Sequence, residues 1–474
     1  MLRKFINRTE ELSSLNRDYQ NKAFSFTVIY GRRRVGKTEL IHNFQQDKPH
    51  IYFLADRRGT RSNLYRFRKK AADFFEDFEP SLETFDEVFN YIKTKWTRKE
   101  KLVIIIDEFS YLVQQDDSIP SVFQLIVDEI LKDGPFHLIL CGSSVSMIEK
   151  STLAYSSPLY GRRTGQIKVQ PILFRHIHEF FPGLSQDELV KIFGATGGVP
   201  FYLQFFDPNN TFLDNLKHNL FAKDTVLYAE GEFLLREELR EPATFMNILF
   251  AISKGATRPG DIAARSFMEA KDLPYYLETL IRLGFVRKEH PVTEKTTTKK
   301  TIYRIQDNFL RFWFRYVLLH KDSLEQGDYM QAIDDVGKNY NTFLGETFEQ
   351  ISIEMLTHLN STGEMPFSFH KIGRQWGKIP LAAKGQNDYE IDIVAVNNDT
   401  LQILCCECKW QDKKASIDVY HKLKEKAGYV KWLPGRKEYF CLISKSGFTE
   451  NLKKTAKNNG ILLLTLDYYM GVDV

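Results

Sequence analysis

The sequence predicts an α/β protein in which a parallel sheet with a helical lid fills the first part of the chain, a winged helix follows, and a second α/β domain fills the last part. Three observations support this fold class. A glycine-containing loop joins an apolar run to a helical pattern at Val28–Leu40, a continuous β-branched run follows at Leu102–Ser110, and further strand patterns recur between Glu390 and Leu466. Continuous apolar runs are typical of parallel strands that helices cover on both faces.

The composition is that of an ordinary globular protein. The chain has 474 residues, enough for several domains, and its formal net charge of +4 indicates no global affinity for nucleic acid. Its five cysteines, Cys141, Cys405, Cys406, Cys408 and Cys441, suggest neither a zinc site nor a disulfide framework, which fits a reducing compartment. Because the first residues show no apolar signal region and no run is long enough to span a membrane, we expect a soluble, cytoplasmic protein.

The loop from Gly31 to Thr38 has the spacing G-x-x-x-x-G-K-T of a phosphate-binding loop. It follows an apolar strand at Phe26–Tyr30 and precedes a helix at Glu39–Gln45, which is the context that the pattern requires. Two glycines let successive backbone N–H groups turn towards a phosphate, and the helix N-terminus adds its positive end. We expect Lys37 to reach the β- and γ-phosphates of a nucleotide and Thr38 to bind Mg²⁺. The predicted nucleotide-binding residues of this loop are Gly31, Arg32, Arg33, Arg34, Val35, Gly36, Lys37, Thr38 and Glu39.

The buried strand pattern at Leu102–Ser110 carries two acids towards its end. Asp107 suits a direct or outer-shell role at Mg²⁺, and Glu108 suits a base that orients the attacking water. Two acids after a strand are also common without a function, but the phosphate loop that precedes them favours hydrolysis. The next buried strand, His137–Ser144, ends in small polar residues, and Ser143 is the candidate sensor of the γ-phosphate.

The segment after this core contains an arginine pair and a glycine-rich junction. Arg162 and Arg163, in the turn Pro158–Gly165, are expected either to reach phosphate, from this subunit or a neighbouring one, or to lie in a solvated turn. Gly198, with the glycine before it, ends one helix and Pro200 begins the next, because glycine is common just after a helix and proline in its first turn. A small helical lid over a nucleotide would contain such a junction.

Taken in order, these motifs resemble the archaeal ATPase family, a branch of the AAA+ and STAND-like P-loop ATPases. The motifs that carry the resemblance are Arg8, Gly31–Thr38, Asp107 with Glu108, Ser143, Leu159–Arg163 and Gly197–Pro200. The resemblance covers about the first half of the chain and implies an ATP-binding core with a helical lid. It implies that Gly198 and Pro200 lie near the nucleotide base and that Arg8 belongs to the nucleotide site. Which arginine acts on the nucleotide stays open.

A winged helix-turn-helix is predicted after the lid. Helical patterns at Phe245–Ser253, Ile262–Phe267 and Pro274–Leu283 precede two short strands, Phe285–Arg287 and Thr301–Ile305, around a polar tip. From position 282 to position 315, Lys and Arg outnumber Asp and Glu nine to three, which suits contacts with DNA phosphates. A winged helix that serves only as a spacer between protein parts is the alternative.

The last part of the chain carries a candidate metal site on a predicted hairpin. Glu407 and Lys409 share one face of the strand Leu401–Trp410, and Asp392 lies on the preceding strand, Glu390–Ala395. Two carboxylates can hold Mg²⁺ and position a water, while the lysine stabilises the charge that develops on a phosphate. A Glu–Lys pair on the surface of a strand, without a function, is the alternative.

This order of an acid, a hairpin and E-x-K resembles the PD-(D/E)XK nuclease superfamily, although Ile391 stands where the motif has proline. That superfamily often adds an acid from an upstream helix, and Glu349 or Glu346 fits this role. The whole chain then looks like the archaeal ATPases that carry a C-terminal restriction-endonuclease-like domain. The metal-binding and catalytic residues implied by the resemblance are Asp392, Glu407, Glu349 and Lys409.

The sequence therefore predicts a P-loop ATPase core at residues 1–170, a helical lid at 171–240, a winged helix at 241–320 and a nuclease-like domain at 321–474, with a polar boundary at Lys321–Gly337. The predicted function is ATP binding and hydrolysis that control DNA binding and metal-dependent DNA cleavage, in a chain that can form homo-oligomers. The alternative is a nucleotide-controlled switch whose nuclease-like domain only grips DNA. The basic helix around His421–Lys426 suits either a grip on the DNA backbone or a solvated face.

Overall fold

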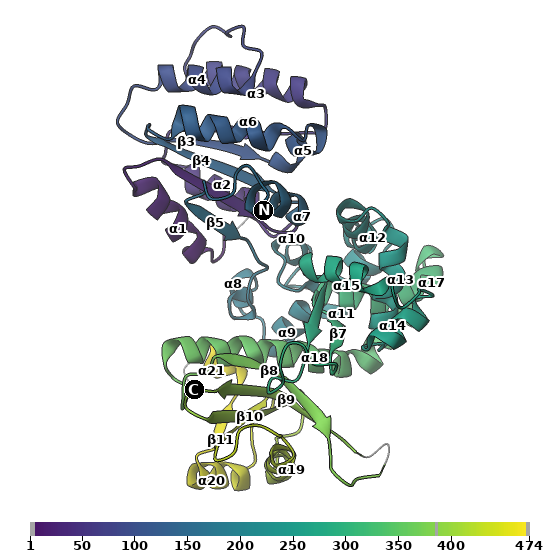
Figure 1. Cartoon of the computed structure of the whole chain (residues 1–474). Helices are drawn as coiled ribbons and strands as arrows, with labels where there is room; N and C mark the ends of the chain where they lie inside the picture. The colour runs from purple at the N-terminus through teal and green to yellow at the C-terminus, as the bar shows by residue number, and fades with distance from the viewer. Residues whose placement is uncertain (1–4, 384–386, 471–474) are drawn as a thin grey trace. The chain divides into compact units, whose positions relative to one another are not determined.

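The computed structural model describes residues 5–383 and 387–470 and divides into two compact units (Figure 1). Unit 1 holds Met1–Ile172 and Val199–Phe201, and unit 2 holds Leu173–Gly198 and Tyr202–Val474. In the described residues, no helix is both long and apolar enough to cross a membrane.

The core of unit 1 is a parallel sheet in the order β2-β3-β4-β1-β5, which confirms the predicted fold class. Its strands are β1 (Ser25–Tyr30), β2 (His50–Leu54), β3 (Leu102–Asp107), β4 (Phe136–Gly142) and β5 (Gly165–Lys168). Strands β1, β3 and β4 are buried along their whole length, as their apolar runs predict. Strand β5 was not predicted: the turn expected at Pro158–Gly165 ends at its first residue, and its four residues have a single buried apolar side chain, that of Ile167.

Helices cover both faces of this sheet (Figure 1). One face packs Val103 and Ile105 against Leu15 of α1 and Leu40 of α2. On the other side, aromatic rings from α3, α4, α5 and α6 lie within 5.0–5.8 Å of one another, centroid to centroid. The helices of unit 1 are α1 (Thr9–Gln20), α2 (Lys37–Gln45), α3 (Thr60–Phe74), α4 (Phe85–Lys95), α5 (Phe109–Gln115), α6 (Ile119–Leu125), which continues as a π-helix over Ile126–Leu131, and α7 (Val145–Ile148), which continues over Glu149–Leu153.

Unit 2 begins with a helical region and the elements of a winged helix. Helices α13, α14 and α15 precede the antiparallel pair β6 and β7, which is the predicted order. The aromatic run that follows is buried, as expected of a core segment. The elements are α8 (Ile177–Phe180), α9 (Gln186–Thr196), α10 (Pro200–Leu203, whose first two residues belong to unit 1), α11 (Phe212–Leu216), α12 (Val226–Glu238), α13 (Pro242–Ser253), α14 (Pro259–Arg265), α15 (Leu273–Arg282), β6 (Val286–Glu289), β7 (Ile302–Ile305), α16 (Asn308–Phe312) and α17 (Lys321–Glu325).

A long helix, α18 (Met330–Thr362), crosses the segment that the sequence analysis assigned to a polar boundary. Ala332, Val336 and Tyr340 are buried along one side of it, and this sparse apolar stripe was masked by the polar residues between them. The remaining elements are β8 (Lys371–Lys378), β9 (Asp388–Asn397), β10 (Gln402–Lys409), α19 (Ile417–Gly428), β11 (Lys437–Ser444), α20 (Glu450–Asn459), β12 (Leu462–Leu464) and α21 (Leu466–Met470).

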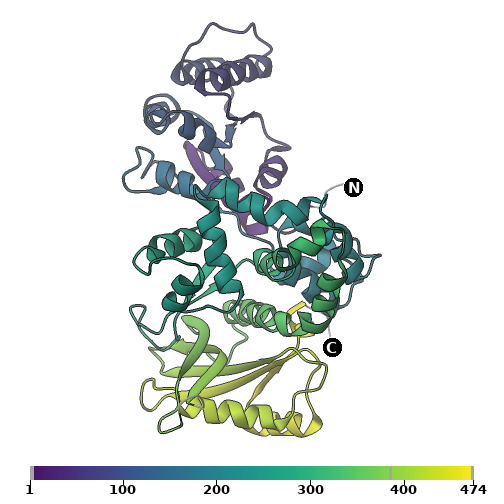
Figure 2. The same ribbon diagram turned by 90° about the vertical axis from the view of Figure 1, so that its right-hand side faces the viewer.

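The strands of this last part form a mixed sheet in the order β12-β11-β10-β9-β8. Strands β8, β9 and β10 are antiparallel neighbours, whereas β10, β11 and β12 are parallel. Helix α18 lies on one face of the sheet and α19 and α20 on the other, as Figures 1 and 2 show. All five cysteines of the chain are buried and free, which agrees with core packing for the three on β10.

The winged-helix hairpin is docked onto this sheet. Val292, just after β6, packs into the hydrophobic core of the sheet, and its N–H donates to the carbonyl of Arg374 on β8 at 3.2 Å. The wing and the C-terminal sheet therefore share one core, within a single compact unit.

Candidate functional site

The phosphate loop of unit 1 lies at the carboxyl end of β1. Gly31 and Gly36 have φ values of 151° and 94°, and a Cβ on Gly31 would lie 2.4 Å from the carbonyl oxygen of Val169. Only glycine fits this position. The Lys37 ammonium donates to the carbonyls of Gly31 at 2.9 Å and Arg32 at 3.0 Å, so it lies across the loop where a phosphate would be held.

The carboxylate of Asp107, at the end of β3, is the hub of a second group of contacts. It accepts from the Thr38 hydroxyl at 3.2 Å and from the Tyr52 hydroxyl at 2.7 Å, and it is buried. Burial, and then the charge of Asp107, raises the pKa of Tyr52, so its hydroxyl stays protonated and donates. A hydroxyl and a carboxylate side by side are oxygen ligands of the kind that Mg²⁺ takes together with nucleotide phosphates, so this pair fits the ion.

Glu108 and Ser143 contact each other directly. Glu108 has a left-handed backbone, with φ 54°, which ends β3 three residues earlier than the sequence pattern indicated and starts α5. Its carboxylate accepts from the Ser143 hydroxyl at 2.8 Å and from the Ser143 N–H at 3.2 Å. The candidate base and the candidate phosphate sensor are therefore joined across the ends of β3 and β4.

The arginines assigned to the nucleotide make contacts within the protein. Arg8 is buried and donates to the carbonyls of Val35 at 2.8 Å and Gln170 at 2.6 Å, so it supports the phosphate loop from behind. Arg162 pairs with Asp128 at 2.8 Å. Arg163 donates to a backbone carbonyl at 3.4 Å and lies over the ring of Tyr160.

The loop arginines and the segment around Pro200 complete this edge. The Arg34 guanidinium lies 4.1 Å from the centre of the Phe201 ring, and Arg33 donates to the Tyr111 hydroxyl at 3.0 Å. The ring of Pro200 lies 3.9 Å from where a Cβ on Gly36 would be, which brings this segment beside the loop. Of the remaining predicted residues, Val35 is buried in the core, Glu39 contacts Asn43, and Gly198 has φ 70°.

The predicted hairpin of unit 2 is confirmed: β9 pairs with β10 in antiparallel register, with Ile393 opposite Cys406. Asp392 and Glu407 follow at the next positions and therefore face each other. The Asp392 carboxylate accepts from the Cys408 N–H at 2.8 Å, and the Lys409 ammonium donates to Glu407 at 2.9 Å. Burial, and then the negative charge of Glu407, raises the pKa of Asp392 to about 6, because two neighbouring carboxylates repel each other when both are ionised.

Lysine and arginine side chains fill much of the space around these acids. Lys426 of α19 donates to both carboxylate oxygens of Glu407, at 3.0 and 3.1 Å. Glu349 contacts Arg374, whose single charge is shared with Glu390. Burial, with Asp392 adding to it and Arg374 opposing it, raises the pKa of Glu349 to about 7. Within residues 5–383 and 387–470, no three His, Cys, Asp or Glu side chains form a metal-binding group.

Glu346, the other upstream acid named from the sequence, belongs to an ionic cluster. Its carboxylate lies 3.0 Å from Arg287, 3.0 Å from Arg311 and 3.6 Å from Arg304. Burial raises the pKa of Glu346, but these positive charges outweigh it and lower the pKa to about 2. Part of the basic excess that predicted DNA contact is therefore used inside the protein, because three of those nine Lys and Arg residues surround one half-buried glutamate.

The comparisons with known proteins agree with the geometry of unit 1. A family described as an ATPase domain predominantly from Archaea matches residues 5–206, and a family of archaeal and bacterial proteins of unknown function matches residues 313–420. The uncharacterized protein MJECL04 of Methanocaldococcus jannaschii is 37% identical over 466 residues, which cover 97% of this chain and 98% of its own. The chain belongs to the archaeal ATPase family.

Among solved structures, the Walker-type ATPase paby2304 of Pyrococcus abyssi is similar to this chain, with a TM-score of 0.51 and 22% sequence identity. The match covers 66% of this chain and 96% of the Pyrococcus protein. At that identity the likeness shows the fold, a P-loop ATPase core. ATP binding and hydrolysis follow from the family and from the fold of unit 1.

Two site residues, Tyr52 and Lys426, were not predicted from the sequence. Tyr52 lies two positions before Leu54, and Leu54 pairs with Asp107 in the sheet. The position of Tyr52 near the carboxyl end of the strands could therefore have been predicted if the strand order had been known. Lys426 was assigned to a basic helix, and nothing in the spacing of that helix indicates a contact with Glu407.

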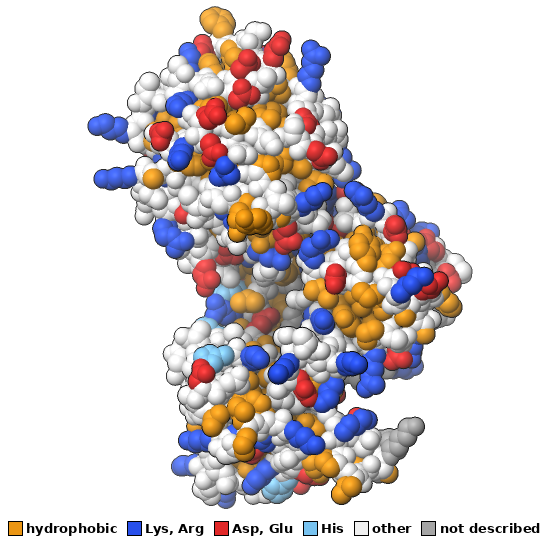
Figure 3. Space-filling model, in the orientation of Figure 1, with side chains coloured by type: hydrophobic (Ala, Val, Ile, Leu, Met, Phe, Trp, Pro, Cys, Tyr) orange, Lys and Arg blue, Asp and Glu red, His pale blue; other side chains and the backbone are white. Residues whose placement is uncertain are grey.

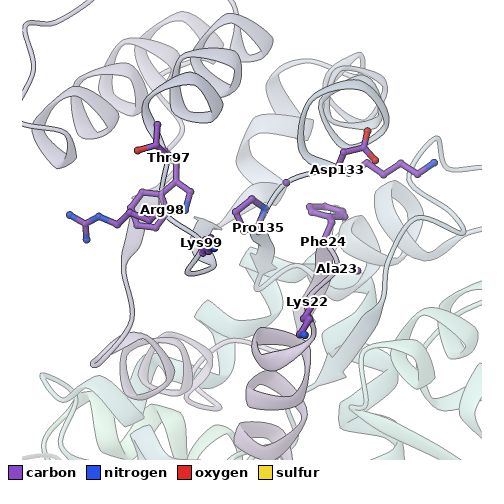
Figure 4. A pocket seen from close by; sticks show the side chains of 11 residues that line it. Lys22, Ala23, Phe24, Thr97, Arg98, Lys99, Asp133 and Pro135 are labelled. Carbon is purple, nitrogen blue, oxygen red and sulfur yellow. The ribbon is translucent and has the colours of Figure 1, made fainter.

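A cavity of about 580 Å³ in unit 1 lies away from this chemistry (Figure 4). Phe24 and Pro135, which line it, come just before β1 and β4, at the edge of the sheet opposite to the phosphate loop. The side chain of Arg98 points away from the cavity in Figure 4, and the lining consists of the loops that enter the strands. It carries no group that the ATPase chemistry requires.

Proposed function

We propose that the ATPase uses its nucleotide state to control a hold on DNA, and that the acid cluster of unit 2 cleaves DNA with Mg²⁺. The observation that supports cleavage is the facing pair of Asp392 and Glu407 with Lys409 beside it. The exposed cations that remain on the wing support DNA contact. We also propose that the protein works in the cytoplasm and that a neighbouring subunit of a homo-oligomer receives Arg162 or Arg163.

At the nucleotide site, each residue has a proposed role that follows from its contacts. Lys37 would hold the β- and γ-phosphates, and Thr38 with Asp107 would hold Mg²⁺, which would supply positive charge for the γ-phosphoryl group as it passes from ADP to water. Glu108 takes the proton of the attacking water once Ser143 turns from its carboxylate to the γ-phosphate. In this proposal, the hydrogen bond between Ser143 and Glu108 is the arrangement of the site before ATP binds.

Two substitutions test these roles. Glu108→Gln should retain ATP binding and slow turnover strongly, because the amide cannot accept the proton of the water. Lys37→Ala should weaken binding itself. A Glu108→Gln variant that hydrolyses ATP at the wild-type rate would remove Glu108 from the role of base.

At the acid cluster, Asp392 and Glu407 would hold Mg²⁺, and Lys409 would contact the scissile phosphate or its attacking water. Mg²⁺ commonly binds through one or two carboxylates and keeps several waters, so two carboxylates suffice for the ion. For Glu407 to bind it, the Lys426 ammonium must release at least one of its two oxygens. DNA phosphate is the natural alternative partner for that ammonium.

Plasmid nicking by the full chain tests cleavage, with Mg²⁺ or Mn²⁺ and with or without ATP. Asp392→Asn should abolish nicking and leave ATP hydrolysis unchanged, because the two sites lie in separate compact units. The matched control is Asp399→Asn, an exposed acid in the turn after β9, which should nick like the wild type. Nicking by Asp392→Asn at the wild-type rate would refute the metal assignment.

The contact of Lys426 with both oxygens of Glu407 favours a second candidate function. In this candidate the domain grips DNA without cutting it, and ATP controls the grip. Absence of nicking with either metal, together with DNA affinity that changes between ATP and ADP, would establish it.

A further inference from the structure

A pocket of about 530 Å³ lies within unit 2, where the wing meets the β8–β9 hairpin. Its lining includes five cations, among them Arg258, Lys299 and Lys431, and three aromatic side chains, Trp376, Tyr389 and Tyr429. We propose that this pocket binds one unpaired nucleotide of a DNA strand. The proposal rests on the DNA binding of the proposed function and adds the form of DNA and the place where it is held.

The walls of the pocket belong to one packed structure. The N–H and hydroxyl of Thr293, on the wing, donate to the side-chain oxygen of Gln375 on β8 at 3.2 and 3.1 Å. Gln375 is buried, and Val292 beside it is part of the core of the C-terminal sheet. The pocket is therefore preformed, which lowers the entropy cost of binding.

The charge of the pocket selects an anion. Lys300 pairs with Glu294 at 2.6 Å and Lys378 pairs with Asp388 at 2.7 Å, so these four lining residues add no net charge to the pocket. Arg258, Lys299 and Lys431 are exposed and have no ion pair among the residues that the structure describes. Figure 3 shows Lys and Arg side chains on the part of unit 2 beside the β8–β9 hairpin.

The aromatic side chains select a base. Trp376 and Tyr429 are half-buried and offer ring surface to the pocket, while the Tyr389 ring, 5.9 Å from that of Tyr429 and at 44° to it, is buried in the core behind them. Bases stack on such rings whatever their identity, and cations beside the rings follow the phosphates, as in proteins that bind single strands. The volume is that of a site for a small molecule, and a base that is paired and stacked within a duplex cannot enter it.

The test measures binding of a fluorescently labelled oligothymidylate to the full-length protein by anisotropy, with a duplex of equal length in parallel. The wild type should prefer the single strand. Trp376→Leu should weaken that binding by at least about fivefold, since one stacked base contributes this much or more. The Lys299→Ala, Lys431→Ala double variant should reduce the slope of log affinity against log salt by about 1.4, the effect of two phosphate contacts on a single strand.

The matched control removes two exposed lysines of α20, Lys454 and Lys457, and so makes the same change in net charge away from the pocket. It should bind the single strand like the wild type. ATP hydrolysis and thermal melting verify that each variant is folded, and the double variant alters only exposed side chains.

The outcomes separate this inference from the proposed function. A wild type that binds DNA while both pocket variants bind it equally well overturns the pocket alone. If the pocket variants lose affinity equally for the single strand and the duplex, the pocket does not bind an unpaired nucleotide. The same conclusion follows if an acidic peptide displaces the probe and unlabelled oligothymidylate does not. A wild type that binds no DNA in any nucleotide state overturns the proposed DNA binding and the pocket together.

Discussion

Replacing Glu346 with glutamine should destabilise unit 2 by about 3 kcal/mol at neutral pH. Its pKa falls from the ordinary 4.5 to about 2, and each pKa unit corresponds to about 1.4 kcal/mol of stability. A second argument gives the same size: Glu346→Gln leaves Arg311 buried without its carboxylate partner, and breaking a buried ion pair costs about 3–5 kcal/mol. The amide keeps the size of the side chain, so the loss reports the charge.

The sign of the pH dependence follows from the direction of the shift. Because folding lowers the pKa of Glu346, its contribution is present above its ordinary pKa of 4.5 and is lost as the pH falls towards 2. The difference between wild type and Glu346→Gln should therefore shrink on acidification. Glu354→Gln, on the same helix, is the matched control, because burial raises the pKa of Glu354 to about 7. Its contribution is present below pH 4.5 and is lost as the pH rises through 7, so this variant should gain on the wild type in that range.

Urea unfolding followed by tryptophan fluorescence measures the effect. Four of the five tryptophans, Trp313, Trp376, Trp410 and Trp432, belong to unit 2, so the signal follows this unit. With a typical slope of about 1–3 kcal/mol per molar urea, the midpoint of Glu346→Gln should fall by about 1 M or more at pH 7. A shift equal to that of Glu354→Gln would refute the reasoning, because the arginine cluster would then contribute nothing specific.

Three further outcomes follow from the contacts of single residues. Gly31→Ala should abolish binding of a fluorescent ATP analogue, because its Cβ would lie 2.4 Å from the Val169 carbonyl; wild-type affinity would contradict the loop geometry. Gly231→Ala should lower the free energy of unfolding by about 1–3 kcal/mol, because its Cβ would lie 2.3 Å from the Trp313 ring. Gly345→Ala, whose Cβ would have no other atom within 4 Å, should raise the free energy of unfolding by about 0.5–1 kcal/mol in the same urea assay. Tyr52→Phe removes a hydrogen bond to Asp107 and should raise the Mg²⁺ concentration needed for half-maximal ATP hydrolysis; an unchanged requirement would show that the bond does not position that carboxylate.

The parts of the fold that the sequence predicted well are those in which local pattern and burial agree. Strand β3 is apolar throughout and buried throughout, and the phosphate loop is a local motif whose glycines meet a local steric need. The parts that it missed depend on distant partners. Strand β5 is held by pairing with β1 rather than by its own apolar content, and the start of α18 is held by a stripe of three buried residues among polar ones.

The same distinction applies to the docked wing. Its hairpin was predictable from two short strands around a polar tip, but its attachment to the C-terminal sheet was not. That attachment depends on Val292 entering a core formed by residues about a hundred positions later, and no local signal marks it. The basic residues of the wing region were counted as a DNA surface, although Arg287 and Arg304 face Glu346. Counting charges along the chain cannot separate cations that are paired inside the protein from cations that face solvent.

The sequence motif could not decide between two glutamates one helical turn apart, Glu346 and Glu349, as the upstream acid of the candidate metal site. Both lie on α18 before the hairpin, and the motif admits either as its upstream acid. Three arginines from three elements fix Glu346 as part of the packing between the wing and the helix. Glu349 lies close enough to Asp392 for the charge of Asp392 to raise its pKa. Of the two, Glu349 is therefore the acid that we propose as the third member of the hairpin site, and that role requires the Arg374 guanidinium, which contacts both Glu349 and Glu390, to release it.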